Sequence, residues 1–398
     1  MKLAYAVALA AIPLAAQEPT FEPKGAFAVE VSAENFRELR LPIYRNAITS
    51  LAVVDGFAIG GTSAVTGLTP YIFAVSLDKR RLEAAVPLQD VVAGQQSIRS
   101  GFGRGPEGWL YAGTMPAAKG GSGHIIRVRM RERLEVVDMG VPVLSEGVIA
   151  LTADSRAGVV YGLSHPSGKF FAFHTADGKT DIHNQTSPDR QALAELESYV
   201  LAPEDYLSRR LAMDAAGRVY GSCPLNRIFR FDPASRTITI LDDEMPSVAG
   251  RRALGRADAW ALATDGALYG SNAADGVLFR IDPASGKVVN LGKPVMMPRM
   301  KGLGFGSDGA LYGVAGGAPG YTHFFVRDPV RGFDDLGIAE AEMRAPGLEQ
   351  GIRWRGYQIG TVAASEDGRY IVLGEEEALS QVLVLPVEGI AAARKQKQ

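Results

Sequence analysis

One strand–turn–strand unit recurs several times in the sequence. "GALYGSNAADGVLFRIDPASG" spans residues 266–286, and "GRVYGSCPLNRIFRFDPASR" at 217–236 has nearly the same wording. A third version, "GALYGVAGGAPGYTHFFVRDPVRG", spans 309–332. A unit that recurs at a regular spacing is the signature of repeat architectures, in which neighbouring units bury each other's apolar faces. The repeat therefore limits the possible folds more than any other feature of the chain.

The spacing of the repeats indicates the kind of repeat. Aligning the chain on the "LYG" element gives Ala58, Tyr111, Tyr161, Tyr220, Tyr269, Tyr312 and, more weakly, Tyr370. Successive positions are 43 to 59 residues apart, which is typical of β-propeller blades with loops of variable length. Each unit contains short apolar strands with β-branched and aromatic residues, separated by turns rich in Gly, Asp, Asn and Pro. A pair of β-sandwiches would not explain a period near 50.

We predict an all-β fold, a seven-bladed β-propeller in a single domain over 24–390, with six or eight blades as the alternatives. The blades are expected at about 47–88, 96–143, 146–187, 207–246, 257–295, 299–340 and 357–389. The segment "GAFAVEVSAENFRELRLP" (25–42) has no blade of its own. It is expected to supply the outer strand of the last blade, since closing the ring removes exposed sheet edges. The one helix candidate is 190–200, and 391–398 is expected to be a solvated basic tail.

The first residues resemble a targeting segment. "MKLAYAVALAAIPLAAQ" has one Lys, an apolar run over 3–14 and two small residues after it, which is the pattern of a secretory signal peptide over 1–17. A buried N-terminal helix is the alternative. The apolar run is too short to span a membrane, and no later run is long enough. The sequence therefore predicts a secreted or periplasmic protein without a membrane span.

Composition excludes several classes of function. The net charge of −2 gives no overall field that would favour nucleic acid, so any preference for a charged ligand must be local. Cys223 is the only cysteine, so no internal disulfide can form, and we expect it to be a small buried side chain. Metal-binding spacings such as CxxC and HExxH are missing. A monomer is expected.

Two positions in every propeller repeat open onto one central mouth: the start of the first strand and the loop after the second. The side chains at these positions are Arg99, Tyr206, Arg209, Arg210, Asp258, Trp260, Arg299, Lys301, Arg355 and Tyr357 at strand starts, and His124, His165, Lys169, Arg227 and His323 in the loops. This mouth is predicted to be cationic and edged by aromatic rings. Arginine forks pair with carboxylates and sulfates, so an anionic polysaccharide or oligosaccharide is the expected partner.

Some stretches resemble known families. The wording "DGALYGSNAADGVLFRIDPASG" is similar to secreted bacterial propellers of the virginiamycin B lyase type. The stretches "SGHIIRV", "GVVYGLSHPSGKFFAF" and "YLSRRLAMDAAGRVYGS" resemble seven-bladed polysaccharide lyases of the ulvan lyase type. The second resemblance implies β-elimination beside a uronic acid. A cation would neutralise the substrate carboxylate, a base would remove the C5 proton, and an acid would protonate the leaving oxygen.

The resemblance to ulvan lyases also implies roles for particular residues. His124 and Tyr206 would be catalytic, with His165 as a possible substitute, and Arg209 or Arg210 would be the family's arginine. Arg99 stands where the family pattern leads us to expect a histidine, and an arginine cannot act as a base at ordinary pH. The predicted substrate-binding set is Arg99, Arg209, Arg210, Arg227, Trp260, Arg299, Lys301 and Tyr357. No cofactor is required for this chemistry, and a structural divalent metal is allowed.

Other interpretations stay open. The mouth could bind glycans or proteins without catalysis, or the chain could be another propeller enzyme, such as a streptogramin lyase or a lactonase. A lactonase would need several metal ligands, and Asp258 with Asn272 are too few. Arg209 and Arg210 are expected to point to opposite sides, as neighbours in a strand do. His323 is expected to be structural, Tyr161, Tyr220, Tyr269 and Tyr312 to be core, and "GEEE" (374–377) to be a solvated turn.

Overall fold

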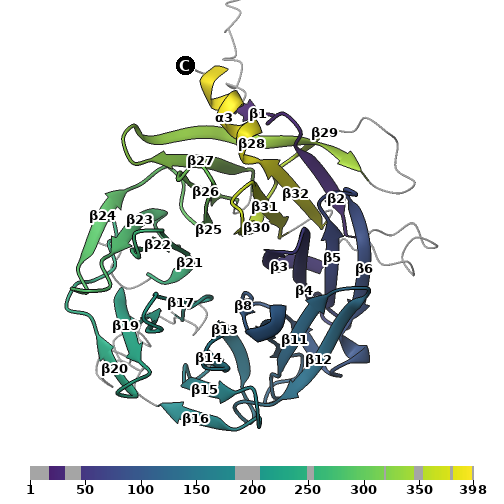
Figure 1. Ribbon diagram of the computed structural model, residues 1–398, viewed down its shortest axis with the longest axis vertical. Helices are drawn as coiled ribbons and strands as arrows, with labels where there is room; N and C mark the ends of the chain where they lie inside the picture. Colours follow the sequence, from purple (N-terminus) through teal and green to yellow (C-terminus); the bar gives the residue numbers. More distant parts are fainter. Residues whose placement is uncertain are drawn as a thin grey trace, which may run out of the picture.

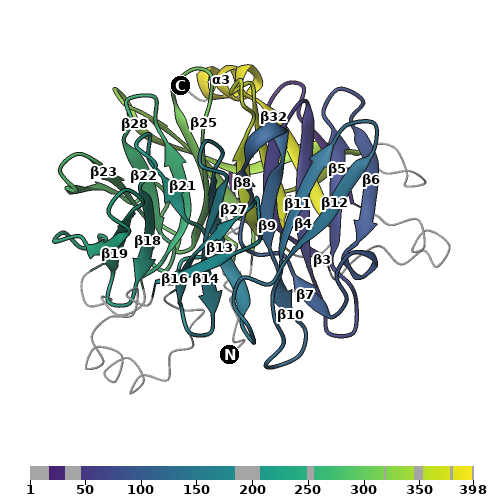
Figure 2. The ribbon, with the colours of Figure 1, turned by 60° about the horizontal axis from the view of Figure 1, so that its bottom comes forward.

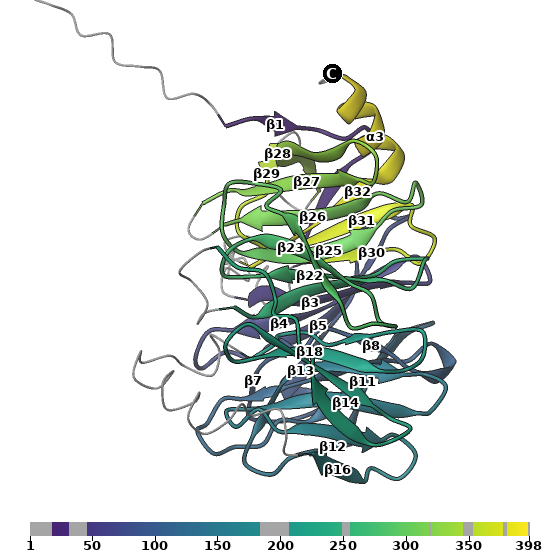
Figure 3. The ribbon, with the colours of Figure 1, turned by 90° about the vertical axis from the view of Figure 1, so that its left-hand side faces the viewer.

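The computed structural model describes residues 18–31, 46–183, 207–248, 255–317, 320–344, 353–376 and 380–396. Their strands form sheets that stand around a common centre, as Figure 1 shows. Turned views show the strands running across the thickness of this ring (Figures 2 and 3). The fold is a β-propeller, as the repeat predicted.

Five of the sheets follow the chain in order. The first contains β3 (Asn46–Val54), β4 (Phe57–Ala64), β5 (Tyr71–Ser76) and β6 (Arg81–Pro87), with β7 (Gln95–Ser97) and β10 (Met115–Pro116) at the edge. The second contains β8 (Gly103–Arg104), β9 (Leu110–Gly113), β11 (Ile125–Met130) and β12 (Leu134–Gly140), and the third contains β13 (Gly147–Asp154), β14 (Val159–His165), β15 (Phe170–His174) and β16 (Thr180–His183). The fourth contains β17 (Ala212–Met213), β18 (Val219–Cys223), β19 (Arg227–Asp232) and β20 (Thr237–Ile240), and the fifth contains β21 (Ala257–Leu262), β22 (Leu268–Asn272), β23 (Val277–Ile281) and β24 (Val288–Gly292). Two single-turn 3-10 helices, Leu88–Asp90 and Pro106–Gly108, lie in the connections.

The sixth sheet closes the ring. It contains β25 (Met300–Phe305), β26 (Leu311–Gly316), β27 (Thr322–Asp328), β28 (Gly332–Arg344), β2 (Phe27–Glu30), β32 (Gln381–Pro386), β31 (Tyr370–Glu375) and β30 (Ile359–Ala364), while β1 (Thr20–Phe21) and β29 (Arg353–Arg355) pair with β28. Strand β2 runs antiparallel to β32, with Phe27 opposite Val384, and parallel to β28. The N-terminal strand is thus the outer neighbour of the last strands, which confirms the predicted closure. The strand groups are compatible with seven blades, and the exact number stays a prediction.

The glycine that ends the repeated "LYG" element leaves space for a phenylalanine ring. In five sheets this glycine, on the second strand, lies opposite a phenylalanine of the third strand: Gly60–Phe73, Gly162–Phe171, Gly221–Phe229, Gly270–Phe279 and Gly313–Phe325. A β-carbon on any of these glycines would lie only 2.1 to 2.5 Å from the ring. Glycine recurs at this position because each phenylalanine ring fills the space that a side chain on the glycine would occupy.

The tyrosine of the same wording is a core residue, as predicted. Tyr161, Tyr220, Tyr269 and Tyr312 are all buried. The hydroxyl of Tyr220 donates to the Asp214 carboxylate at 3.1 Å, and that of Tyr312 donates to Asp308 at 2.6 Å. Burial, followed by the nearby Asp214 charge, raises the pKa of Tyr220 to about 12. These tyrosines fasten the second strand to the preceding turn.

The C-terminal segment differs from the expected solvated tail. Residues Val387–Gln396 form helix α3, which packs on the last sheet with Ile390 fully buried. The Arg394 guanidinium is also buried and forms ion pairs with Asp328 of β27 and Asp334 of β28. Compensation by two carboxylates explains why a charged residue of this segment is buried.

Several expectations concern residues outside the described part of the chain. These are the signal peptide over 1–17, the helix candidate at 190–200 and Tyr206. Among the residues that the structure describes, no helix has both the length and the apolar character needed to cross a bilayer.

Candidate functional site

Two adjacent chambers, which share Arg209, Asp258, Lys301 and Glu376 in their linings, lie where the first strands of several sheets meet. The narrow chamber, of about 20 Å³, is lined by Thr49, Arg99, Arg209, Arg210, Asp258, Lys301, Gly360 and Glu376. The wide chamber, of about 310 Å³, is lined by Arg209, Arg256, Asp258, Ala273, Ala274, Pro298, Arg299, Lys301 and Glu376. We call the two chambers together the central pocket. Its lining comes from strands β3, β21, β25 and β30 and from segments next to β7, β17, β22 and β31, so several sheets of the ring assemble it together.

Two carboxylates of the central pocket are held by ion pairs. Asp258 is 4% exposed, and Arg256 donates to it as a fork, with Nε–Oδ1 at 2.6 Å and Nη2–Oδ2 at 3.0 Å. Glu376 is paired with the buried ammonium of Lys301. Glu376 and Lys301 are 75 positions apart in sequence and meet only because the closing of the ring brings β25 beside β30.

The surrounding cations keep both carboxylates ionised. Burial alone would raise the pKa of Asp258, but the charges of Arg256, Arg209 and Lys301 outweigh it and hold this pKa below the ordinary 3.8. Burial would likewise raise the pKa of Glu376. The charges of Lys301, Arg209 and Arg99, with the Lys301 hydrogen bond, hold it below 4.5. At neutral pH neither group can donate a proton, and both are weak bases.

Arg210 is fixed in the wall of the pocket. Its Nη2 donates to the Thr361 hydroxyl, and its backbone carbonyl accepts a bond from Trp260 Nε1 at 3.1 Å. Burial lowers the pKa of the Arg210 guanidinium to about 10, so it remains a cation at neutral pH.

The other arginines have few partners. Burial also lowers the pKa of Arg209, and within the described residues its guanidinium makes no hydrogen bond or ion pair. Arg99 has one long contact, from its Nε to the Ser63 hydroxyl at 3.4 Å. Arg299 is exposed at the edge of the wide chamber. Three guanidinium groups are thus available to a ligand.

The central pocket carries an excess of positive charge. Six cationic side chains and two carboxylates line it, which leaves four positive charges, although the whole chain has a net charge of −2. A water-restricted pocket with fixed like charges attracts anions strongly, because the local dielectric constant is low. The predicted cationic mouth therefore corresponds to a defined pocket.

The structure brings five of the predicted site residues together. Arg99, Arg209, Arg210, Arg299 and Lys301 all line the central pocket. Arg209 and Arg210 were expected to face opposite sides, and this was wrong: both line the narrow chamber. They lie in a bend before β17 and not in a strand, so the alternation of strand residues does not apply to them.

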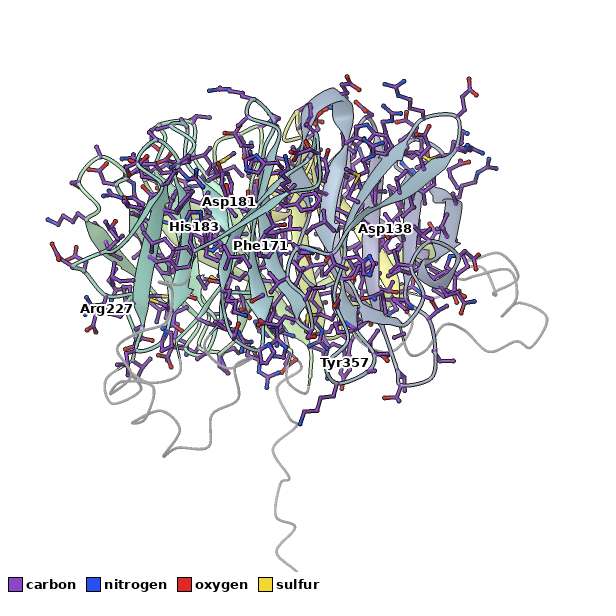
Figure 4. The ribbon with its side chains drawn as sticks, turned by 90° about the horizontal axis from the view of Figure 1, so that it is seen from below. Asp138, Phe171, Asp181, His183, Arg227 and Tyr357 are labelled. Atoms are coloured by element: carbon purple, nitrogen blue, oxygen red, sulfur yellow. The ribbon has the colours of Figure 1, made fainter. Side chains whose placement is uncertain are left out.

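His124 lies elsewhere, against an outer strand. Its Nδ1 contacts both oxygens of Asp138 on β12, at 2.9 and 3.1 Å, and Gly140 N–H donates to the same carboxylate at 2.8 Å. His323 repeats the arrangement with Asp335, at 3.0 and 2.9 Å, and Gly337. Figure 4 labels Asp138 on the side of the molecule, where this residue is exposed. The repetition on two sheets indicates a structural role that holds a bulge in the outer strand.

Four further candidates do not line either chamber of the central pocket. His165 ends β14 opposite Gly147 and is partly buried. Arg227 begins β19, and its Nη2 is 3.4 Å from the Leu241 carbonyl oxygen. The Trp260 ring packs edge-on against Phe279 at 5.6 Å, and the Tyr357 ring contacts Tyr321 at 5.5 Å. Figure 4 shows Tyr357 at the lower face and Arg227 near the left edge of the molecule.

Sequence reasoning missed Arg256 and Glu376. Arg256 is two residues before Asp258, and this spacing places both on one side of an extended chain, a signal that could have found it. Glu376 belongs to "GEEE", which was expected to be a solvated turn. Instead Glu375 is fully buried and Glu376 lines both chambers. No local pattern indicates this, because the cations around Glu376 come from other sheets.

The described residues contain no group of three or more His, Cys, Asp or Glu side chains placed to hold a metal ion. The expectation of a structural divalent metal therefore stays a prediction.

The ring of sheets and the central pocket define the class of this protein as a β-propeller. No protein-family model matches the chain, and no curated protein matches its sequence. Solved structures do. Virginiamycin B lyase from Staphylococcus aureus aligns with a TM-score of 0.61 at 12% identity, over 91% of this chain and 99% of that one. A streptogramin B lyase aligns with a TM-score of 0.61 at 10% identity, over 90% and 97%.

The similarity extends to propellers of other kinds. The WD40 repeats of RRP9 align with a TM-score of 0.54 at 12% identity, over 86% of this chain and 94% of that one. Identities this low establish the fold alone. The likeness to virginiamycin B lyase-type propellers is confirmed at that level, and the resemblance to ulvan lyases stays a prediction.

Proposed function

We propose that the central pocket binds a carboxylate or sulfate group of an anionic saccharide. The observation that carries this proposal is the Arg209 guanidinium, which is largely buried and makes no ion pair within the described residues. Taking a charge out of water without a hydrogen-bonded partner costs free energy. The nearby charges of Asp258 and Glu376 offset this cost only in part, and an anionic ligand would offset it further. Arg99 and Arg299 add two further donors at the same pocket, and a guanidinium fork matches the two oxygens of such a group.

Charge is the basis of recognition in this proposal. The aromatic residues expected to stack on sugar rings, Trp260 and Tyr357, contact other aromatic rings and do not line the chambers. A volume of about 310 Å³ in the wide chamber suits one charged sugar unit, with the remainder of a chain outside it. That the ligand is a saccharide follows from the resemblance to polysaccharide lyases. The experiment below tests both the saccharide and its charge.

Binding isotherms would test this function. Oligo-uronates, a sulfated oligosaccharide and a neutral glucan oligosaccharide of equal length would be titrated into the protein at low salt. We expect binding of the anionic ligands only. Arg209→Gln should weaken it at least about tenfold, since an Arg–carboxylate contact is worth roughly 1.5–3 kcal/mol. Arg131→Gln, which removes the same charge from an exposed hairpin turn, is the matched control. Equal binding of the neutral ligand, or no effect of Arg209→Gln, would contradict the proposal.

Elimination chemistry is the second candidate function. It is favoured by the structural likeness to proteins described as lyases and by the cations of the central pocket. A cation beside a uronate carboxylate would acidify the C5 proton. A base would take that proton, the C4–O bond would break with its electrons leaving on oxygen, and a C4=C5 double bond would form.

The base is the open part of the elimination proposal. The two carboxylates of the pocket are weak bases, and His124 is paired with Asp138. Tyr206, adjacent to the described Leu207, remains the proposed proton-transfer group. His165, the proposed substitute, lines neither chamber and would have to act from outside them. Ultraviolet absorbance of the new double bond, after mixing the protein with ulvan, heparinoids, pectate and alginate, would detect the reaction. Binding without any rise in absorbance would favour the non-catalytic function.

A further inference from the structure

Glu376 occupies an unusual place in the central pocket. It follows β31 directly and lines both chambers, and its charge lies among the cations there. Its carboxylate is paired with Lys301 and lies within electrostatic reach of Arg209 and Arg99. The chain itself therefore places one carboxylate among the cations that the proposed ligand would contact.

The second carboxylate, Asp258, is held differently. Two hydrogen bonds from Arg256 and an exposed fraction of 4% fix it in the wall. The Glu376 side chain is 27% exposed, has its ion pair with the single ammonium of Lys301, and follows the last residue of β31. Of the two carboxylates, Glu376 is the one that can turn away without leaving a buried arginine fork unpaired.

We propose that Glu376 is a built-in competitor for the anionic ligand, with its carboxylate standing where a carboxylate or sulfate of the ligand binds. This inference rests on the proposed function of the central pocket. An incoming anion would displace Glu376 from Lys301 and take over the contacts with Lys301 and Arg209. Glu376 is then a specificity-determining residue. It keeps the cations compensated in the empty pocket, and it disfavours ligands whose charge is too weak to displace it.

The test is to remove this charge and measure whether binding becomes tighter. In Glu376→Gln the side chain keeps its size but no longer competes for Lys301, so the dissociation constant for a sulfated oligosaccharide should fall about tenfold. Glu366→Gln is the matched control. It makes the same change in net charge, and Glu366 belongs to a separate pocket that shares no residue with the central one. Glu366→Gln should leave the dissociation constant within about twofold of the wild type.

Unchanged or weaker binding by Glu376→Gln, with measurable binding by the wild type, would overturn this inference and leave the proposed function standing. If neither protein binds any anionic ligand, both are overturned. Glu376→Ala gives a second readout, because it removes the charge and the side-chain volume together and should also tighten binding. The melting temperature of each variant shows whether the protein is folded.

Discussion

Asp258 organises the cationic side chains of the central pocket. Its buried carboxylate accepts the fork of Arg256 and compensates part of the charges of Arg209 and Lys301. A buried carboxylate with such partners is costly to neutralise, because the arginines around it would then repel one another in a low-dielectric site.

Asp258→Asn should therefore destabilise the fold. We expect the free energy of unfolding to fall by about 3 kcal/mol, the usual result of breaking a buried ion pair from one side. Urea denaturation followed by tryptophan fluorescence would measure it. Asp242→Asn, at an exposed position, should change the free energy by less than about 0.5 kcal/mol. Equal stability of the two variants would contradict this role of Asp258.

The same carboxylates make stability depend on pH. Folding lowers the pKa of Asp258 below 3.8 and of Glu376 below 4.5, so their stabilising effect is complete above about pH 5. It is lost as the pH falls through the lowered values, because the folded protein must then take up protons on groups that its cations keep ionised. In a pH series of unfolding measurements, the wild type should lose stability more steeply below pH 5 than Asp258→Asn. Parallel curves would contradict the assignment.

Residue-level prediction succeeded where position in the repeat decides orientation. Arg99, Arg209, Arg210, Arg299 and Lys301 could be found because the start of a first strand always opens onto the centre. It failed for Glu376, whose partner Lys301 is 75 positions away, because contacts made across the ring leave no local pattern. It also failed for His124, since nothing in the sequence distinguishes a histidine that pairs with Asp138 in its own repeat from one that faces the centre.

Among the elements, the glycine–phenylalanine pairs determine how the second strand packs against the third strand in five of the sheets. Gly270 faces the ring of Phe279, and a β-carbon there would come within 2.4 Å of the ring. The repeated glycine and phenylalanine thus reflect how the core packs, and the fold class could be predicted from this repeat.

Gly270→Ala should be destabilising by roughly 2 kcal/mol, because the Phe279 ring must leave its place in the core to admit the methyl group. Gly356→Ala is the matched control, since the nearest atom to a β-carbon there is at 3.6 Å and its backbone is not in the left-handed region. Thermal unfolding of both variants would measure the difference. Equal melting temperatures would mean that the core yields to the extra methyl group.

Helix α3 is an element that could not be predicted. Residues 391–398 contain three basic residues, and this composition normally belongs to a solvated segment. The Arg394 guanidinium is buried because Asp334 and Asp328, 60 and 66 positions earlier, meet it in the folded chain. Only the closed ring brings these groups together.

At the scale of the whole molecule, the ring depends on strand β2. Phe27 and Val29 are both 2% exposed, and β2 fills the gap between β32 and β28. Without it, two strands would have unpaired edges, which promote association between molecules.

A variant that begins at residue 32 should lose at least about 3 kcal/mol of stability, the value of burying two such apolar side chains, and should self-associate. A variant that begins at residue 18 keeps β1 and β2 and should show the same light scattering and melting temperature as the full chain. Light scattering and thermal unfolding would compare the two. A monomeric and equally stable shorter variant would contradict the role of β2 in closure.

The pairing of β2 with β32 also sets an order of events during synthesis. A ribosome delivers residues 27–30 more than 350 positions before residues 381–386, so β2 waits for its β32 partner while all the intervening sheets are made. The intervening sheets can form as they emerge, but the ring closes only when β32 has been made. Until then, the unpaired edge of β2 is open to proteases and to premature self-association.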